Sequence, residues 1–185
     1  MDYGIYKNAR NASWQCLIDC SISELPIKPV QIAANYGIHC KQADKSVLKG
    51  ASGEIECLNG EIFISFDIQD PRQRQRYTVM HELGHYLLGH LGNEPLSRRE
   101  SECRPEEEQA ADKFAIDMLA PACVLWGLDL HTAEEIAQLC NISMQAAKYR
   151  AERMKLLYKR NKFLSHPLER MAFNQFKDFL NKNKR

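Results

Sequence analysis

Five consecutive residues near the middle of the chain have the types and spacing needed for metal-dependent hydrolysis. They are His81, Glu82, Leu83, Gly84 and His85, and they form the pattern HExxH. Histidines four residues apart lie on one face of a helix, so both imidazoles can reach one metal ion. The glutamate lies about 100° further round the helix, where it can reach a water on the metal. Zinc would lower the pKa of that water, and the glutamate would carry its proton to the leaving amine.

The flanking residues predict a helix around this motif. Asp70 followed by Pro71 is typical of a helix start, with an N-capping acid and a proline in the first helical position. Leu83 and Leu87 fall on the face opposite the histidines, so the helix has one polar face and one apolar, core-facing stripe. Gly89 is suited to end the helix.

A third protein ligand is expected, because catalytic zinc usually has three protein ligands and one open position. The chain lacks the metzincin pattern HExxHxxGxxH, since Leu88 stands in place of its glycine and Leu91 in place of its last histidine. His90 is one residue out of register and falls near the far side of the helix from His81. We therefore expect His90 to face solvent or to lie at the helix end instead of binding the metal.

A carboxylate from the following predicted helix, at residues 105–120, is the better candidate. Glu108 and Asp112 are four residues apart and share a face with Ala111 and Ala115, whose small side chains allow close approach to the motif helix. We expect Glu108 to bind the metal and Asp112 to accept a hydrogen bond from a ligating imidazole. An acidic first turn that complements the helix dipole is the alternative, but it does not explain an acid pair facing the alanines.

Longer segments around both groups resemble the ImmA/IrrE family of metallopeptidases. RYTVMHELGH at residues 76–85, EQAADKFA at 108–115 and LAP at 119–121 are similar to that family's FT-x-x-HELGH helix, its ExxAN-x-FA run and the proline that follows. Tyr77 stands in place of phenylalanine, and Asp112 in place of asparagine. The resemblance covers about residues 20–125.

Residues and resemblance together predict a fold and an activity. We expect an α+β fold, in which a zincin-like domain with a small antiparallel sheet and an active-site helix precedes a helical C-terminal region. The expected enzyme is a gluzincin-like, intracellular zinc endopeptidase that binds Zn²⁺ through His81, His85 and Glu108 and uses Glu82 as general base. The resemblance implies a substrate as well, since better-known family members cleave a helix-turn-helix repressor and so switch on genes of mobile elements or stress responses.

Hydrolysis also needs a donor that stabilises the oxyanion. Tyr77, Tyr86, His131 and His166 are the candidates, and the sequence does not choose among them.

Composition is ordinary for a globular chain of 185 residues, which can bury a proper core. We expect a metallopeptidase domain at residues 1–128 and a basic helical extension at 129–185. No apolar run reaches membrane length and the N-terminus has no signal-peptide core, so the cytoplasm is the expected location.

The seven cysteines are then predicted to be free thiols; a second metal site at Cys16 and Cys20, or ligation by Cys103, is a minor alternative.

Periodicity and turn signals place the other elements of the first part. The predicted elements are helices at 5–20 and 28–36, a strand at 38–41, and strands at 54–58 and 61–67. Asn59-Gly60 between the last two is a strong hairpin signal. An edge strand of this sheet could hold an extended peptide substrate. A polar loop at 91–104 joins the two metal-binding helices.

The C-terminal part is basic. Residues 143–185 hold twelve lysines and arginines against three acids, a balance of +9, whereas the whole chain carries +1. Thr132 and Glu135 form a capping box, Ser143 caps a second helix after a short turn, and a last amphipathic helix starts near Pro167. These helices could pack on the protease domain with a solvated basic face, dock the substrate repressor, or bind DNA. The alternative function is therefore a metal-containing regulatory protein that acts by DNA or protein binding through its basic helices.

Overall fold

The computed structural model describes residues 3–91 and 105–184, and the chain divides into two compact units. The first unit comprises Met1–Ala12 and Lys28–Ala115, and the second comprises Ser13–Ile27 and Ile116–Arg185. The α+β class is confirmed, since helices accompany one small sheet. The expected boundary between residues 128 and 129 stays a prediction. The loop expected at 91–104 lies outside the described residues, except for residue 91. Cys103 lies outside them as well.

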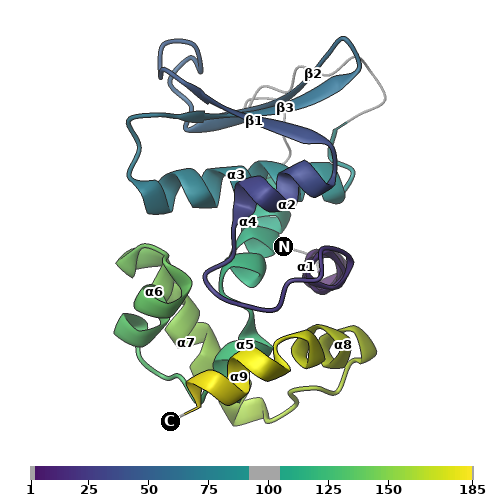
Figure 1. Cartoon of the computed structure of the whole chain (residues 1–185), viewed down its shortest axis with the longest axis vertical. Coiled ribbons are helices and arrows are strands. Elements are labelled where there is room, and N and C mark those ends of the chain that lie inside the picture. Colours follow the sequence, from purple (N-terminus) through teal and green to yellow (C-terminus); the bar gives the residue numbers. More distant parts are fainter. Residues whose placement is uncertain (1–2, 92–104, 185) are drawn as a thin grey trace. The chain divides into compact units, whose positions relative to one another are not determined.

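The elements follow the predicted order. They are α1 (Tyr3–Asp19), α2 (Pro29–Asn35), β1 (Ile38–Ala43), β2 (Gly53–Leu58), β3 (Glu61–Asp67), α3 (Arg72–Leu87) and α4 (Pro105–Leu119), as shown in Figure 1. Asn59 and Gly60 both have positive φ, 53° and 85°, which is the backbone of the tight hairpin turn that their sequence predicts.

The sheet is mixed, whereas an antiparallel sheet was expected. Its strand order is β1-β3-β2, with β2 antiparallel and β1 parallel to β3. Residues 44–52 connect β1 to β2, which lies at the opposite edge of the sheet, and the hairpin then places β3 between these two strands. The two edge strands of the sheet are therefore β1 and β2.

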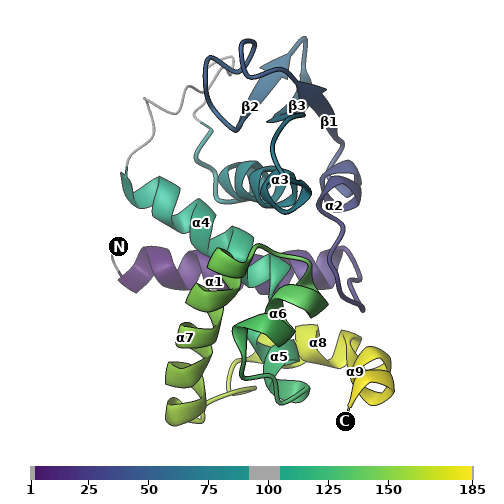
Figure 2. The same cartoon turned by 90° about the vertical axis from the view of Figure 1, so that its left-hand side faces the viewer.

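The two faces of the sheet differ in polarity. Ile55 and Ile64 are opposite each other and buried, and α2 and α3 pack against the sheet, both on one side of it (Figures 1 and 2). The other face carries a salt bridge of 2.9 Å between Lys41 and Glu56, with the Lys41 ammonium also 5.0 Å from the centre of the Phe63 ring. The alternation predicted for β3 thus directs one set of side chains onto the helix that bears HExxH.

The start of α3 lies one residue later than predicted. Pro71 is the N-cap residue, with extended backbone angles of φ −54° and ψ 145°, and the helix begins at Arg72. Asp70 makes no capping hydrogen bond to this helix; its carboxylate lies 3.9 Å from the Arg74 guanidinium. Leu83 of the predicted core stripe is fully buried, as are Val79 and Met80, whereas Leu87 is only half-buried.

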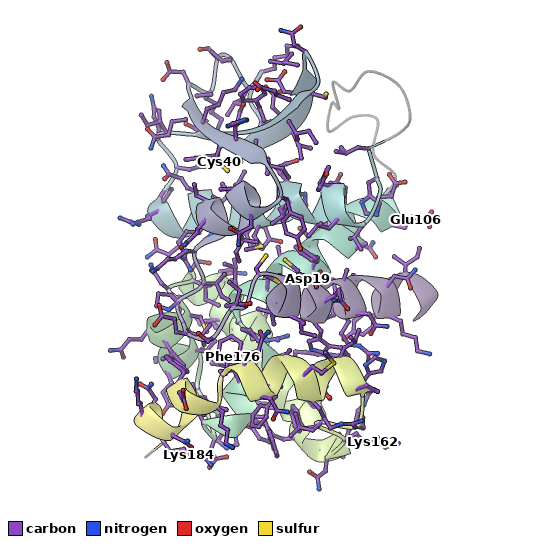
Figure 3. The ribbon with its side chains drawn as sticks, turned by 45° about the vertical axis from the view of Figure 1, so that its right-hand side comes forward. Asp19, Cys40, Glu106, Lys162, Phe176 and Lys184 are labelled. Atoms are coloured by element: carbon purple, nitrogen blue, oxygen red, sulfur yellow. The ribbon has the colours of Figure 1, made fainter. Side chains whose placement is uncertain are left out.

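The second unit is helical. Its further elements are α5 (Ala122–Gly127), α6 (Ala133–Cys140), α7 (Met144–Arg160), α8 (Pro167–Gln175) and α9 (Lys177–Asn183). The predicted capping box of Thr132 and Glu135 is present, and Ser143 caps α7. One last helix was expected, but Phe176 leaves the helical conformation and divides it into two. Phe176 is fully buried, whereas Lys162 and Lys184 are exposed (Figure 3).

The six cysteines within the described residues are free thiols, as predicted, and Cys16 and Cys20 are among them. Among the described helices none is both long and apolar enough to cross a membrane.

Candidate metal centre

Helix α3 and helix α4 together present three potential ligand atoms at one point. Nε2 of His81 lies 3.0 Å from Nε2 of His85. Glu108 on α4 places Oε2 3.2 Å from the His81 nitrogen and Oε1 3.5 Å from the His85 nitrogen. The structure thus brings together the three residues expected to hold a metal.

The size of this triangle suits zinc. Ligands bound at about 2.0–2.2 Å in tetrahedral geometry lie about 3.3–3.6 Å apart, and the three observed separations of 3.0, 3.2 and 3.5 Å are close to that range. Two imidazoles and one carboxylate are also a ligand set of catalytic zinc, which leaves a fourth position open. The residues therefore fit the ion that the motif predicts.

A glycine allows the two helices to approach so closely. A Cβ atom on Gly84 would lie 2.9 Å from Cδ1 of Phe114 and 3.4 Å from the Cα atom of Ala111. Ala111 and Phe114 are both fully buried. The close approach predicted from Ala111 is present, and Gly84, which lies between His81 and His85 in the sequence, provides the matching space on α3.

We expect Gly84→Ala to weaken this packing. The added methyl group must displace the buried Phe114 ring, which costs about 1–3 kcal/mol and outweighs the roughly 1 kcal/mol that alanine gains in a helix. Urea unfolding of the zinc-free variant should therefore show lower stability than the wild type. Phe114→Leu in the same chain should remove part of that loss, because it makes room for the methyl group. A stabilised Gly84→Ala protein would contradict the close approach.

Asp112 anchors the first histidine, in the role that its place one turn after Glu108 predicts. Its Oδ1 atom lies 2.9 Å from Nδ1 of His81 and accepts a hydrogen bond of 2.6 Å from the Tyr77 hydroxyl. Burial alone would raise the pKa of Asp112, but the hydrogen bonds from His81 and Tyr77 outweigh it and lower that pKa. The aspartate is therefore held as a carboxylate between two donors.

Tyr77 is held as a neutral hydroxyl. Burial, followed by the charge of Asp112 and the hydrogen bond to it, raises the pKa of Tyr77 far above its usual value. Its proton is directed at Asp112, so the tyrosine hydroxyl, which a phenylalanine would lack, supports the aspartate that contacts His81. The hydroxyl is thus engaged away from the three ligand atoms, which argues against Tyr77 as the oxyanion donor.

The other three candidates for the oxyanion donor are His131, His166 and Tyr86. His131 is 2.9 Å from an Asp129 carboxylate oxygen and stacks on Tyr158, and His166 caps α8, all within the second unit. Tyr86 lies half-buried on α3. These contacts give His131 and His166 structural roles.

His81 is predominantly protonated in the metal-free protein at neutral pH. Burial lowers the pKa of His81, but hydrogen bonds to Asp112 and Glu108 and the charge of the buried Glu82 raise it more, to about 9. A metal can bind only the neutral ring, so binding must remove this proton.

We therefore expect zinc uptake at pH 7 to release about one proton from His81. Because the pKa is raised, the release should be complete well below pH 9 and should fade as the pH rises through about 9, where the free ring is already neutral. Calorimetric titrations in buffers of different ionisation enthalpy measure the number of protons. Equal heats at pH 7 in all such buffers would contradict the expectation.

His90 was expected to face solvent or to lie at the helix end, and it does lie just past the end of α3, where its Nδ1 atom is 2.9 Å from Nδ1 of His85. The helical angle that placed it far from His81 does not apply, because α3 ends at Leu87. The signal in the sequence was Gly89, whose positive φ of 72° turns the chain back at the helix end.

The sequence matches a family model described as the IrrE N-terminal-like domain, over residues 33–152. The match contains all residues of the candidate metal centre, together with α5, α6 and the first half of α7. No curated protein matches the chain.

Proposed function

The chain belongs to the IrrE N-terminal-like family of metallopeptidases, and from this membership we propose that it is a zinc endopeptidase acting through His81, Glu82, His85 and Glu108. The observation that carries the proposal is the convergence of two histidines and a glutamate from two helices, with a buried glutamate beside the first histidine. A site that only stabilised the fold would need the ligands but would have no use for Glu82.

Each side chain then has a chemical task. His81, His85 and Glu108 would hold zinc, which supplies a Lewis acid for the peptide carbonyl and lowers the pKa of water. Glu82 would take a proton from the attacking water as its oxygen bonds to the carbonyl carbon. The same carboxyl group would return the proton to the amine as the carbon–nitrogen bond breaks. Asp112 would fix the orientation of His81.

The substrate we propose is a helix-turn-helix repressor, cleaved at one position so that its genes are expressed. The support is the family resemblance of the metal-binding segments. The cytoplasm, where such a repressor acts, is part of the same proposal.

The test uses purified repressors encoded beside the gene for this protein. Each is incubated with the zinc-loaded protein and analysed by intact mass, with a sample containing EDTA alongside. One discrete cut that EDTA prevents would support the proposal. Zinc-loaded protein that leaves every such repressor whole would contradict the proposed substrate, while peptide libraries would still test the peptidase activity.

The exposed face of α7 favours the second candidate function, a regulatory protein that binds DNA or protein. Lys148, Lys155 and Lys159 are exposed on this helix, and Tyr149 is 70 % exposed. Arg150, however, is buried and forms a 2.9 Å ion pair with Asp117, so it serves the interior of the second unit. DNA binding that weakens steeply with salt, and that persists when Glu82 is replaced by glutamine, would favour this candidate.

A further inference from the structure

His85 has a partner on the side of its ring that faces away from the other ligand atoms. Its Nδ1 atom lies 2.9 Å from Nδ1 of His90, and the two ring centres are 5.1 Å apart at an interplanar angle of 63°. His85 is buried and His90 is half-buried, so the contact is partly shielded from water.

The end of α3 brings His90 to this place. The amide of His90 donates to the carbonyl of His85 at 3.0 Å, and the amide of Gly89 donates to the carbonyl of Tyr86 at 3.1 Å. This pair of hydrogen bonds, with a left-handed residue at Gly89, is a Schellman motif. In that motif the second residue past the cap returns over the residue five positions earlier, which here is His90 over His85. A hydrophobic contact commonly fills this position, whereas this chain has two imidazoles.

Ligand geometry determines the direction of the hydrogen bond. Nε2 of His85 lies 3.0 Å from the His81 nitrogen and 3.5 Å from a Glu108 oxygen, so Nε2 is the atom that would bind the metal. A neutral imidazole whose Nε2 lone pair is given to a metal carries its proton on Nδ1. Nδ1 of His85 must then donate, and Nδ1 of His90 must accept.

We propose that His90 is a positioning residue that fixes the ring of His85 for zinc, as Asp112 does for His81. The proposal rests on the metal centre of the proposed function. Both ligating rings would thereby be held through Nδ1 with Nε2 directed at the ion: His81 by a carboxylate from α4, and His85 by a neutral imidazole from the cap of its own helix. Partners of this kind keep the tautomer and the orientation that binding requires.

The experiment compares zinc dissociation constants, measured by chelator competition, for the wild type and three variants. His90→Phe keeps a ring but removes the acceptor, and should weaken zinc binding about 10- to 100-fold. His90→Asn offers an amide oxygen at a similar position and should recover most of the affinity. His39→Leu, on β1 and stacked on Phe63, should bind as the wild type does.

Unfolding of the zinc-free proteins separates positioning from folding. The stability of zinc-free His90→Phe should stay close to that of the wild type; should it fail to fold, His90→Leu takes its place. The proposal would be overturned if His90→Phe bound zinc as tightly as the wild type. It would also be overturned if His90→Asn bound zinc as weakly as His90→Phe. Wild-type protein that binds no zinc would overturn the metal centre as well, whereas the first two outcomes leave that centre intact.

Discussion

Replacing Glu82 with glutamine is expected to lower the rate of peptide-bond hydrolysis about 1,000-fold while zinc stays bound. Glutamine has nearly the same shape but cannot accept and return a proton. The proposed ligand atoms belong to His81, His85 and Glu108, so the zinc content should not change. The turnover rate of a cleaved peptide measures the loss of hydrolysis. The zinc content, measured by mass spectrometry, shows whether the metal stays bound.

A matched substitution removes a carboxylate that has no place in the mechanism. Glu106 is exposed in the first turn of α4, as Figure 3 shows, so Glu106→Gln should leave turnover unchanged. A Glu82→Gln protein that hydrolyses peptides at the wild-type rate would exclude Glu82 as general base. A variant that loses both zinc and activity would instead place the Glu82 side chain among the groups that hold the site together.

Glu108→Ala is expected to abolish stable zinc binding and, with it, hydrolysis. The substitution leaves only two ligands, both from α3, and removes the sole ligand that α4 contributes within the described residues. Free zinc at 100 times its dissociation constant stabilises a binding-competent protein by about 2.7 kcal/mol. The wild type should show this gain in urea unfolding, and Glu108→Ala should show almost none.

Asp112→Asn provides the graded comparison for Glu108→Ala. Its amide oxygen can still accept a hydrogen bond from His81, so zinc affinity should fall by at most about 10- to 100-fold and not disappear. A Glu108→Ala protein that retains zinc as tightly as Asp112→Asn would remove Glu108 from the ligand set.

Local patterns were sufficient to predict most elements of the first unit. The alternation in β3, the turn at Asn59-Gly60 and the apolar stripe of α3 each depend on residues close in sequence, and each is present. The parallel pairing of β1 could not be predicted in this way. Its alternation fits either direction, because strand direction depends on backbone hydrogen bonds to a strand about twenty residues away.

The candidate site was predictable where its residues lie on one continuous helix. The four-residue spacing predicted that His81 lies beside His85 and that Glu108 lies beside Asp112. In the structure His81 contacts the other three residues. His90 escaped that reasoning, because helical angles lose their meaning after the left-handed residue Gly89. The support from Tyr77 was also missed, since it depends on how α3 and α4 meet.

The origin of the ligands on two helices has a consequence for the unfolded chain. His81 and Glu108 are 27 residues apart in sequence, so a zinc ion that binds both acts as a reversible cross-link. In the unfolded chain, zinc binding to both residues would close a flexible loop of that length, which costs roughly 3 kcal/mol of chain entropy. In the folded protein the loop is already closed, because Gly84 packs against Ala111 and Phe114. The unfolded chain should therefore compete poorly for the metal, and bound zinc should slow the unfolding of the protein.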